Sequence, residues 1–309
     1  MNARRLAIGG ATLALLLVAL RVRSGIVFGL VVLVAIFVPM EKLFALHPRK
    51  TLRDRWKTDA VHFVVNNMLI TVGLVVALVV SIVALHWMVN PDLRAAVASQ
   101  PGWLQFLEAV LVADLAQYWA HRANHEVPLL WRFHKVHHSI EEMDWLAAGR
   151  LHPIDSVFTR AAAILPLYVL GFSRATFGGY LVFTAFMAIF IHANVRFRFG
   201  PLRWVTATPE FHHWHHALAP VNKNYAGQLP LLDVVFGTCH LPTHQMPAAY
   251  GIRERIPDGY LAQLAWPFKR ATPFEPAMPF ERAPSTRADR ESAAPSGGEA
   301  ARYPVGNSA

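Results

Sequence analysis

The chain is poor in cysteine and in charged residues. Cys239 is the one cysteine among 309 residues, so an intramolecular disulfide is excluded, and we expect this side chain to serve packing. Charged residues make up 16% of the sequence, against about 25% in typical soluble domains, whereas 54% of residues are hydrophobic. These proportions predict a membrane protein and argue against a small secreted domain held by disulfides.

The formal net charge of +9 is unevenly distributed. Basic residues lie beside apolar runs and not in a stripe with stacking aromatics, which excludes nucleic acid as a partner. The densest basic stretch, HPRKTLRDRWK at 47–57, carries five lysines and arginines against Asp54 alone. By the positive-inside rule we expect this loop to be cytoplasmic.

Apolar runs recur along the first two thirds of the chain. The first, Leu6–Leu20, follows Arg4 and Arg5 as in a signal peptide, but no small-x-small cleavage site follows, so we expect an uncleaved helix. Further spans are predicted at 25–46, 61–89 and 103–120, with an apolar hairpin at 157–172 and 176–191 that turns near Ser173. The sequence therefore predicts an all-α integral membrane protein with about four to six transmembrane or re-entrant helices.

Composition changes again near the C-terminus. From about Pro273 the sequence is rich in Pro, Ala, Ser, Gly, Glu and Arg and has no apolar periodicity. Such a segment cannot bury enough surface to fold alone, so we expect a disordered tail at 273–309. The sequence contains no internal repeat apart from the histidine pattern described next.

Histidine is concentrated in the middle of the chain, where eleven of the sixteen histidines fall between His121 and His216. Nine of them form three groups with the patterns HxxxH, HxxHH and HHxHH. The groups are His121 and His125; His134, His137 and His138; and His212, His213, His215 and His216. Spacings of three and four residues place imidazoles on one helix face, and neutral imidazole is the commonest protein ligand of iron, zinc and copper.

The HxxHH pattern, which occurs twice, predicts how the ligands are shared between two metals. On a helix, the first and last rings can hold one metal while the middle ring leans toward a second. Together with the HxxxH pair, the two patterns supply eight nitrogens, enough for two metals with open positions. Because the apolar hairpin leads the chain out and back, we expect the three groups to meet in a histidine-rich di-metal cap on the cytoplasmic side.

Other histidines have weaker patterns. His152, before Pro153, and His192, at the end of an apolar run, are additional candidate ligands, although either one alone would more often be structural. His213 is expected to be an outer-sphere or exposed residue and not a ligand. No metal-binding role is assigned to His47, His62, His86, His240 or His244.

Asp114 and Tyr118 precede His121 and His125 so that all four lie on one helical stripe. An aspartate inside an apolar helix is costly unless it has a partner, so a functional role is the default interpretation. We expect the Asp114 carboxylate to accept the second ring proton of a ligating histidine and to fix its tautomer. The alternative is a polar residue satisfied by a neighbouring helix.

Iron, zinc and copper all suit an all-imidazole site. A closed structural zinc site needs only four ligands, whereas paired redox iron uses this many histidines more naturally.

Two other classes of protein remain as alternatives. A membrane zinc hydrolase would need a glutamate general base, as in HExxH, and none of the three groups contains one. A metal transporter or sensor would carry a low-complexity histidine-rich loop, whereas these histidines lie among apolar and aromatic residues.

Taken together, the motifs resemble those of the fatty acid hydroxylase/sterol desaturase family. The matching elements are DxxxYWxHRxxH from Asp114, HxxHH from His134, His152-Pro153, His192-x-Asn194, HxxHH from His212, Asn224-Tyr225 and Phe236-Gly237-Thr238. The resemblance implies a catalytic domain at 55–245, preceded by N-terminal membrane helices and the basic loop at 1–54. A C-terminal extension at 246–272 would then lead into the tail.

The resemblance implies a non-haem di-iron membrane oxygenase that uses O2 to hydroxylate or desaturate a sterol, fatty acyl or isoprenoid-like lipid. The implied core iron ligands are His121, His125, His134, His137, His138, His212, His215 and His216, with His152 and His192 as further candidates. Asp155 and Asn194 join Asp114 and Tyr118 as catalytic candidates. The family often has glutamate where this chain has Asp155, which leaves the supporting role of that carboxylate open.

The expected partners follow from the same resemblance. The sequence contains no HPGG haem-binding motif, so we expect electrons to come from a separate ferredoxin or cytochrome b5-like carrier. Basic cytoplasmic loops would attract an acidic carrier over long range. The apolar substrate is expected to enter from the bilayer, so that the helices supply both the anchor and the binding slot.

Overall fold

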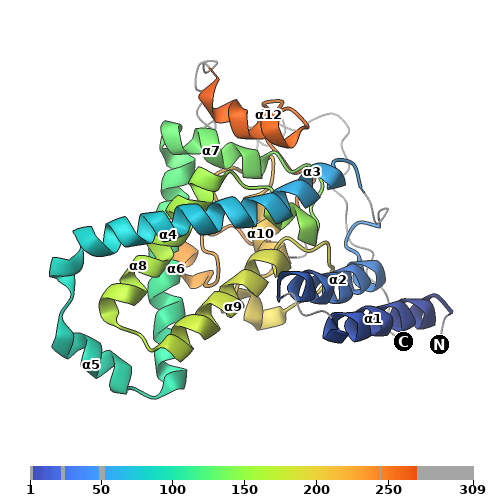
Figure 1. Cartoon of the computed structure of the whole chain (residues 1–309). Helices are drawn as coiled ribbons and strands as arrows, with labels where there is room; N and C mark the ends of the chain where they lie inside the picture. The colour runs from blue at the N-terminus through green and yellow to red at the C-terminus, as the bar shows by residue number, and fades with distance from the viewer. Residues whose placement is uncertain (1–2, 22–24, 49–52, 244, 270–309) are drawn as a thin grey trace.

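The computed structural model describes residues 3–21, 25–48, 53–243 and 245–269, and its regular structure there is helical (Figure 1). The α-helices are α1 (Ala3–Arg21), α2 (Gly25–Phe44), α3 (Trp56–Val61), α4 (Asn67–Ala84), α5 (Pro91–Ser99), α6 (Gly102–Glu126), α7 (Pro128–His138), α8 (Pro153–Leu170), α9 (Arg174–Phe190), α10 (Pro209–His215), α11 (Leu231–Val235) and α12 (Tyr260–Ala265). In these ranges β structure is limited to two isolated bridges. The predicted all-α class is confirmed, while the predicted tail at 273–309 lies outside the described residues.

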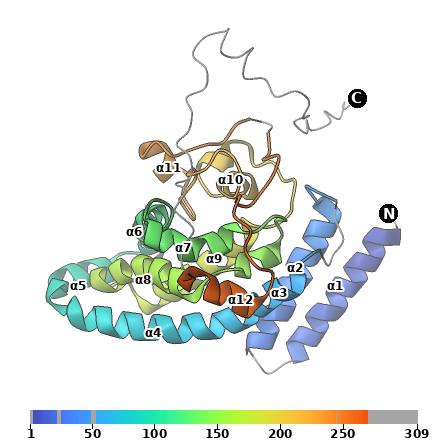
Figure 2. The same cartoon turned by 90° about the horizontal axis from the view of Figure 1, so that it is seen from above.

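The predicted apolar runs correspond closely to helices. Helices α1 and α2 pack side by side as an N-terminal hairpin, set against one end of the remaining bundle (Figures 1 and 2). A π-helical turn at His62–Asn66 joins α3 to α4, so that a continuous helix runs over Trp56–Ala84. The predicted span at 61–89 begins and ends five residues too late: the charged first turn of α3 conceals the start, and the helix ends at Ala84, where a 3-10 turn at His86–Met88 follows.

The long helix Trp56–Ala84 has the surface expected of a membrane span. Its mean hydropathy is 2.5, and only 6% of the residues in its most apolar 18-residue stretch are buried within the protein. Val72 and Val83 are 66% and 73% exposed, which is unfavourable in water and natural in lipid. Helix α8 is the second described helix that is long and apolar enough to cross a membrane. The total of four to six spans stays a prediction.

Helix α6 is the centre of the bundle and packs against α7, α8 and α9. The small side chains of Ala109 and Ala113 are fully buried at this contact, as is typical where membrane helices approach closely. Helices α8 and α9 form the predicted hairpin. Its turn uses Gly171 at φ +80°, a left-handed conformation that favours glycine, and Ser173 caps the start of α9.

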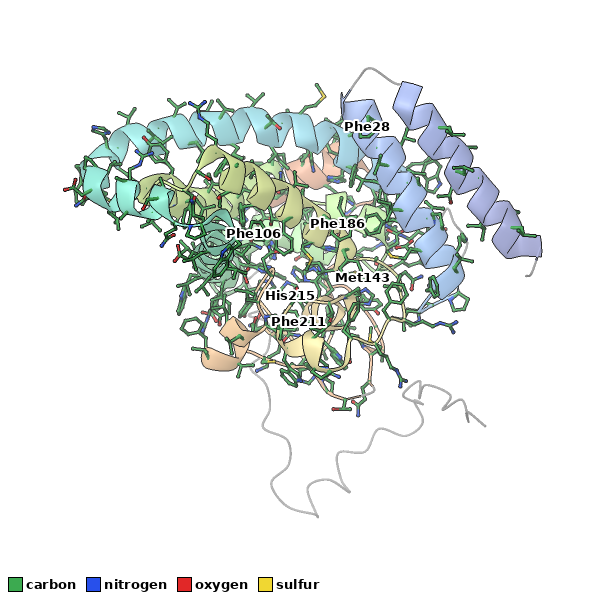
Figure 3. The ribbon with its side chains drawn as sticks, turned by 90° about the horizontal axis from the view of Figure 1, so that it is seen from below. Phe28, Phe106, Met143, Phe186, Phe211 and His215 are labelled. Carbon is green, nitrogen blue, oxygen red and sulfur yellow. The ribbon has the colours of Figure 1, made fainter. Side chains whose placement is uncertain are left out.

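The segment from Val195 to Tyr250 forms a cap on the bundle. Its short helices α10 and α11 lie on the opposite side of α6 and α9 from α4, and Figure 3 shows Phe211 and His215 on this side. Buried aromatic rings bind the cap to α6: Tyr118 packs between Tyr225 and Phe236, with ring centroids 5.9 and 4.9 Å away. The cap thereby brings α10 against the histidine-bearing ends of α6 and α7.

A buried ion cluster joins α3 to the loop after α7. The Asp59 carboxylate, which has no exposed surface, pairs with Arg150 at 2.5 and 2.9 Å and also with Arg53. Arg53 binds Asp144 as well, at 2.7 Å. The sequence counted Arg53 among the basic residues of the loop at 47–57, and in the structure its side chain is buried and paired with two aspartates.

The C-terminal extension packs back onto the start of the long helix as far as residue 269. The Gln263 side chain on α12 hydrogen-bonds His62 at 2.7 Å, and Thr58 donates to the carbonyl of Asp258 at 2.6 Å. Tyr260 donates to Asn66 at 3.0 Å. The described part of the predicted extension at 246–272 is therefore packed against the predicted catalytic domain, and is not a separate body.

Candidate metal centre

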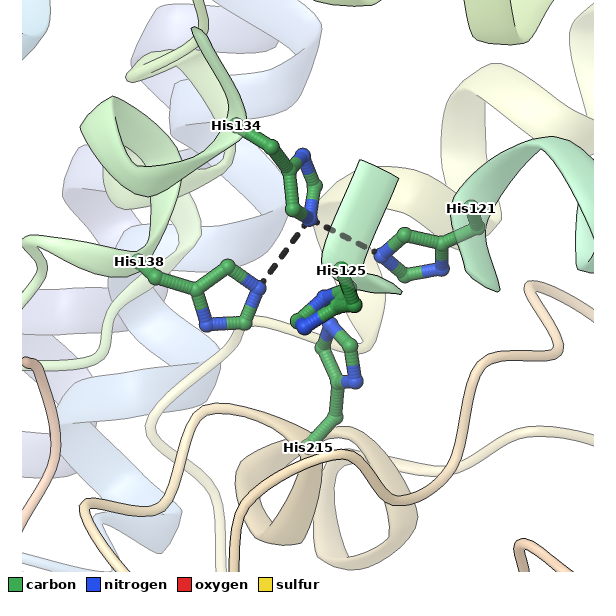
Figure 4. A group of neighbouring side chains, drawn as sticks. All are labelled: His121, His125, His134, His138 and His215. Carbon is green, nitrogen blue, oxygen red and sulfur yellow. Dashed lines mark hydrogen bonds between the residues drawn. The ribbon is translucent and has the colours of Figure 1, made fainter. Parts of the chain in front are cut away.

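Nine histidines from separate segments converge in two buried groups. The first group contains His121, His125, His134, His138 and His215, and the second contains His137, His192, His212 and His216. Within each group, one ring nitrogen of every histidine lies within 4.8 Å of the others. Figure 4 shows the first group, in which rings from α6, α7 and α10 point toward a common centre.

Each HxxHH pattern divides its rings between the two groups. His134 and His138 belong to the first group, whereas His137 between them belongs to the second. On α10 the assignment is reversed, because His212 and His216 lie in the second group and His215 lies in the first. In both patterns the first and last histidines belong to one group and the middle histidine to the other, as predicted. The three histidine motifs also come together in space, as expected.

The helix ends explain why these rings meet. The C-terminal halves of α6 and α7 carry the first five histidines, and His192 follows the C-terminal end of α9. Helix α10 is held in place at its start, where the Thr208 hydroxyl accepts from the backbone N–H of Phe211 at 3.2 Å and Pro209 occupies the first turn. The two groups are adjacent, since the rings of His138 and His216 stack at 4.4 Å.

The outward-facing nitrogens of five of these rings are held by hydrogen-bond acceptors. Nδ1 of His121 lies 2.7 Å from the carbonyl of Tyr225, and Nδ1 of His137 lies 3.0 Å from that of Arg150. Nδ1 of His192 lies 2.7 Å from the carbonyl of Ala188, and Nδ1 of His215 lies 2.8 Å from that of Lys223. Nδ1 of His134 lies 3.1 Å from the Asp155 carboxylate. Each acceptor fixes the ring proton on Nδ1 and leaves the lone pair on Nε2.

The inward-facing nitrogens fit bound metal ions. Nε2 of His121 lies 3.1 Å from Nε2 of His134, and Nε2 of His137 lies 3.2 Å from Nε2 of His192. Because the ring protons are held on Nδ1, the two Nε2 lone pairs in each pair point toward one another. A cation bound between the two nitrogens stabilises this arrangement. Nε2 of His125 and His215 is also buried without a hydrogen-bond partner among the described residues. The donor set therefore suits two metal ions.

Burial keeps these imidazoles in the form that binds metal. Removal from water lowers the pKa of His137, His138 and His215 well below the ordinary value, and neighbouring histidines add to the effect. Burial likewise lowers the pKa of His192 to about 4. Since an imidazole whose pKa lies this low is neutral near pH 7, the rings do not have to lose a proton to coordinate.

Asp155 has the supporting place that the sequence left open. Its buried carboxylate faces Nδ1 of His134 with one oxygen and accepts from the Asn124 amide at 2.7 Å with the other. Asn124, on α6, also donates to Thr159 on α8 at 3.0 Å, which fixes the amide that holds the carboxylate. Sequence reasoning missed Asn124, although its position on α6, one residue before His125, placed it at the site.

Replacing Asp155 with asparagine is expected to lower the affinity for iron by about 10–100-fold, because the charged acceptor that orients His134 is lost. The measurement is the iron retained by purified protein as chelator concentration rises. The exposed Asp92 offers a matched change, Asp92→Asn, which should leave retention unaltered. Asp155→Glu restores a carboxylate and should recover part of the loss; equal retention in Asp155→Asn and the native protein would refute this role.

Two of the predicted catalytic residues lie away from the histidine groups. The Asp114 carboxylate accepts the backbone N–H groups of Gly227, Gln228 and Leu229 at 2.7–3.1 Å and contacts no histidine. The expectation that it fixes a histidine tautomer is corrected, because this buried carboxylate anchors the cap loop to α6. A Cβ at Gly227 would collide with Gln117, so glycine permits this close approach.

Tyr118 is fully buried, and its hydroxyl hydrogen-bonds Thr238 at 2.8 Å. Thr238 in turn donates to Asp233 at 2.6 Å. The hydroxyl is thus occupied within the aromatic core between α6 and the cap. The structure gives Tyr118 a packing role in place of the catalytic role expected from its position on the helical stripe.

Asn194 and His152 are also occupied by structural contacts. Both amide atoms of Asn194 bind the backbone of His47, at 2.8 and 2.9 Å, which ties the end of α2 to the segment after α9. His152 caps the start of α8 by accepting from Ile154 at 3.2 Å, and its Nε2 faces the carbonyl of Leu264 at 3.2 Å. His152 joins neither histidine group, whereas the other additional candidate, His192, is in the second.

His213 is buried, as an outer-sphere residue would be, and its Nδ1 lies 3.0 Å from the Tyr250 hydroxyl. It belongs to neither histidine group, in agreement with the expectation that it is no ligand.

Arg150 is a further residue that the sequence did not single out. Its carbonyl holds His137 while its guanidinium is held by Asp59, which connects the ion cluster to the second group.

Comparison with known proteins agrees with this geometry. Residues 106–238, which contain every histidine of both groups, match the fatty acid hydroxylase family. The matched segment is 133 residues long and is similar to a fatty acid hydroxylase domain. The family resemblance read from the motifs is thereby confirmed, and the match lies inside the predicted catalytic domain at 55–245.

The relatives are lipid-modifying enzymes. The chain is 40% identical over 172 residues to an ornithine lipid hydroxylase of Rhizobium tropici, covering 55% of this chain and 52% of that protein. It is 33% and 32% identical to alkylglycerol monooxygenases of Xenopus tropicalis and Homo sapiens, over 44% and 48% of this chain and 30% and 33% of those proteins. The matches therefore span only about a third to a half of these relatives. No solved structure is significantly similar to the chain.

Proposed function

We propose that this protein is a membrane-bound non-haem di-iron oxygenase that hydroxylates a lipid. The observation that carries the proposal is the pair of adjacent, buried, all-imidazole groups inside a fatty acid hydroxylase domain. Imidazole ligation suits iron, and an open coordination position on each ion is what oxygen chemistry requires. The relatives named above are hydroxylases and monooxygenases, which favours an alcohol product over an alkene.

The first iron would be held by the five histidines of the first group and the second by the four of the second group. When bound, the iron pair would supply the activation of O2 and the oxidation of an unactivated C–H bond. The chain itself fixes the ring tautomers through the carbonyls of Tyr225 and Arg150 and through Asp155. Burial of all nine ligating side chains excludes bulk water from the reacting atoms.

The substrate is proposed to be a bilayer lipid with an amino-acid or glycerol headgroup. Support comes from the two kinds of relatives, which act on ornithine lipids and alkylglycerols by their names. The exposed apolar side chains of α4 support a location in the membrane, where such a lipid resides. A sterol is a weaker candidate, because the matching sterol enzyme, a putative methylsterol monooxygenase of Dictyostelium discoideum, is only 24% identical to the chain over 215 residues.

The electron donor is proposed to be a separate ferredoxin or cytochrome b5-like protein that docks on the cytoplasmic side. The basic stretch at 47–57 favours both this orientation and an acidic partner. For an acidic partner it offers less charge than its composition suggests, because Arg53 pairs with Asp59 and Asp144, and Arg55 pairs with Glu141 and Asp258. Glycosylation-site insertion into the α8–α9 turn would test the orientation.

The zinc hydrolase alternative finds little support in the geometry. Neither group contains a carboxylate that could act as a general base, because every member of both groups is a histidine. The nearest carboxylate described above, Asp155, is held by Asn124 and faces His134 from outside the ligand set. The family match also argues against the transporter or sensor alternative.

The test is lipid mass spectrometry of a host with and without the chain under aeration, followed by the same assay with purified, iron-loaded enzyme supplied with a reduced ferredoxin as the source of two electrons per turnover. A lipid that gains one oxygen, or about 16 mass units, is the expected product, with label from 18O2 appearing in it. Loss of two hydrogens would identify a desaturase instead. Hydrolysis products formed without O2, together with bound zinc, would overturn the proposal.

A further inference from the structure

A basic hollow lies directly after α9, outside both histidine groups. It has a volume of about 120 Å³, and its charged lining consists of Arg196, Arg198, Arg203 and Glu210. Three positive charges against one negative give this lining a formal net charge of +2. We propose that the hollow binds the anionic headgroup of a membrane lipid, an inference that rests on the proposed function as a lipid hydroxylase.

Arg203 supplies a donor that the protein leaves unused. One of its terminal nitrogens pairs with Glu210 at 3.2 Å, and the other donates to the carbonyl of Leu241 at 2.6 Å. The Nε–H of the same guanidinium is buried and has no acceptor among the described residues. A buried donor without an acceptor is unfavourable, and a phosphate or carboxylate oxygen held in the hollow would satisfy it.

The other two arginines are presented by an alternating sequence, Arg196-Phe197-Arg198-Phe199. Phe197 packs on Phe44 at 5.1 Å, while the intervening Arg196 and Arg198 are exposed at the rim of the hollow. The backbone N–H of Arg196 donates to the carbonyl of Phe44 at 2.9 Å, which fixes this segment against the end of α2. The rim charges are therefore held in position by inward-facing aromatic rings.

The surroundings place the hollow at a membrane surface. Leu202, Trp204 and Val205 lie beside Arg203 in the chain and are 57%, 48% and 62% exposed. Tryptophan, aliphatic side chains and arginine grouped after an apolar helix are typical of the headgroup region of a bilayer. A basic surface for an acidic protein would not expose this apolar area to water, so a lipid is the favoured occupant.

The same segments connect the hollow to the second histidine group. Val195, in the lining, follows His192 by three residues, and Glu210 precedes His212 by two. A headgroup held here would leave the adjoining part of the lipid beside the second group. The hollow would then select lipids by their headgroup and set which part of the molecule meets the metal centre.

The test is lipid titration of the purified, full-length, iron-loaded protein in neutral detergent, followed by native mass spectrometry. Phosphatidylglycerol is expected to bind at least about tenfold more tightly than phosphatidylcholine, whose choline cation opposes the arginines. The double variant R196Q/R198Q should lose about tenfold in affinity for phosphatidylglycerol. Arg174→Gln removes an exposed charge at the opposite end of α9 and should change nothing.

Three outcomes would overturn the proposal. They are unchanged phosphatidylglycerol affinity in R196Q/R198Q, displacement by inorganic phosphate at the same concentration as by the lipid, and displacement by an acidic ferredoxin. Normal iron content in each variant shows that the protein is folded. Because lipid binding requires no turnover, a headgroup preference in a protein that fails to hydroxylate any lipid would refute the proposed function and leave this site standing.

Discussion

Under the proposed di-iron function, replacing His137 with alanine is expected to abolish lipid hydroxylation and to reduce bound iron from two ions per chain to one. The second group has four histidines, so this change leaves three, and Nε2 of His192 keeps His212 at 3.1 Å but loses His137 at 3.2 Å. Loss of an outer-sphere partner alone weakens metal sites by about 10–100-fold, so loss of a ligand should exceed the upper end of that range. The measurements are iron content and product formed per chain.

His215→Ala provides an internal comparison, because the first group has five histidines and retains four. We expect this variant to lose activity while keeping more of its iron than His137→Ala. His240 is a suitable control, since it is partly exposed and belongs to neither group. Full activity with two irons in His137→Ala would exclude the assignment of this residue as a ligand.

Replacing Asp59 with alanine is expected to destabilise the protein by about 3–5 kcal/mol, the usual effect of breaking a buried ion pair. The change leaves Arg150 without its carboxylate and Arg53 with Asp144 alone. Because the carbonyl of Arg150 holds His137, iron should also be released at lower temperature. The measurement is the midpoint of thermal unfolding, followed together with iron release.

The matched control for this prediction is Asp258→Ala. Asp258 also pairs with an arginine, Arg55, at 2.7 Å, but its side chain is 63% exposed, so the expected effect is below about 1 kcal/mol. A similar small shift in both variants would show that the buried cluster does not stabilise the fold. A large shift in Asp59→Ala with unchanged iron release would separate the cluster from the metal centre.

Much of the metal centre was predictable because helical spacing fixes which side chains share a face. The HxxHH pattern assigned His134 and His138 to one ion and His137 to another before any contact was known, and the groups divide in this way. The helix boundaries were likewise readable from apolar runs, as the hairpin of α8 and α9 shows. The membrane side of the site is not reported by any contact within the described residues, so it stays a prediction.

The polar residues between the histidines were harder to assign, because their partners lie far away in the sequence. Asp114 lies on the same helical stripe as His121, yet its partners are backbone N–H groups more than 100 residues later, at 227–229. Tyr118 similarly binds Thr238. Spacing along a helix gives the face of a residue but not which distant loop packs on that face.

The sequence by itself determined the all-helical class and which histidines share a helix face, since both follow from local periodicity. Only the tertiary structure decided which remaining polar groups support the site. In the structure the Asp155 carboxylate, held by Asn124, accepts from the His134 ring. Asn194 and His152 make structural contacts instead, and Arg53 pairs with the buried Asp59. The physical reason is that a buried polar group must be satisfied by whatever partner the fold brings to it, and that partner is not encoded by local spacing.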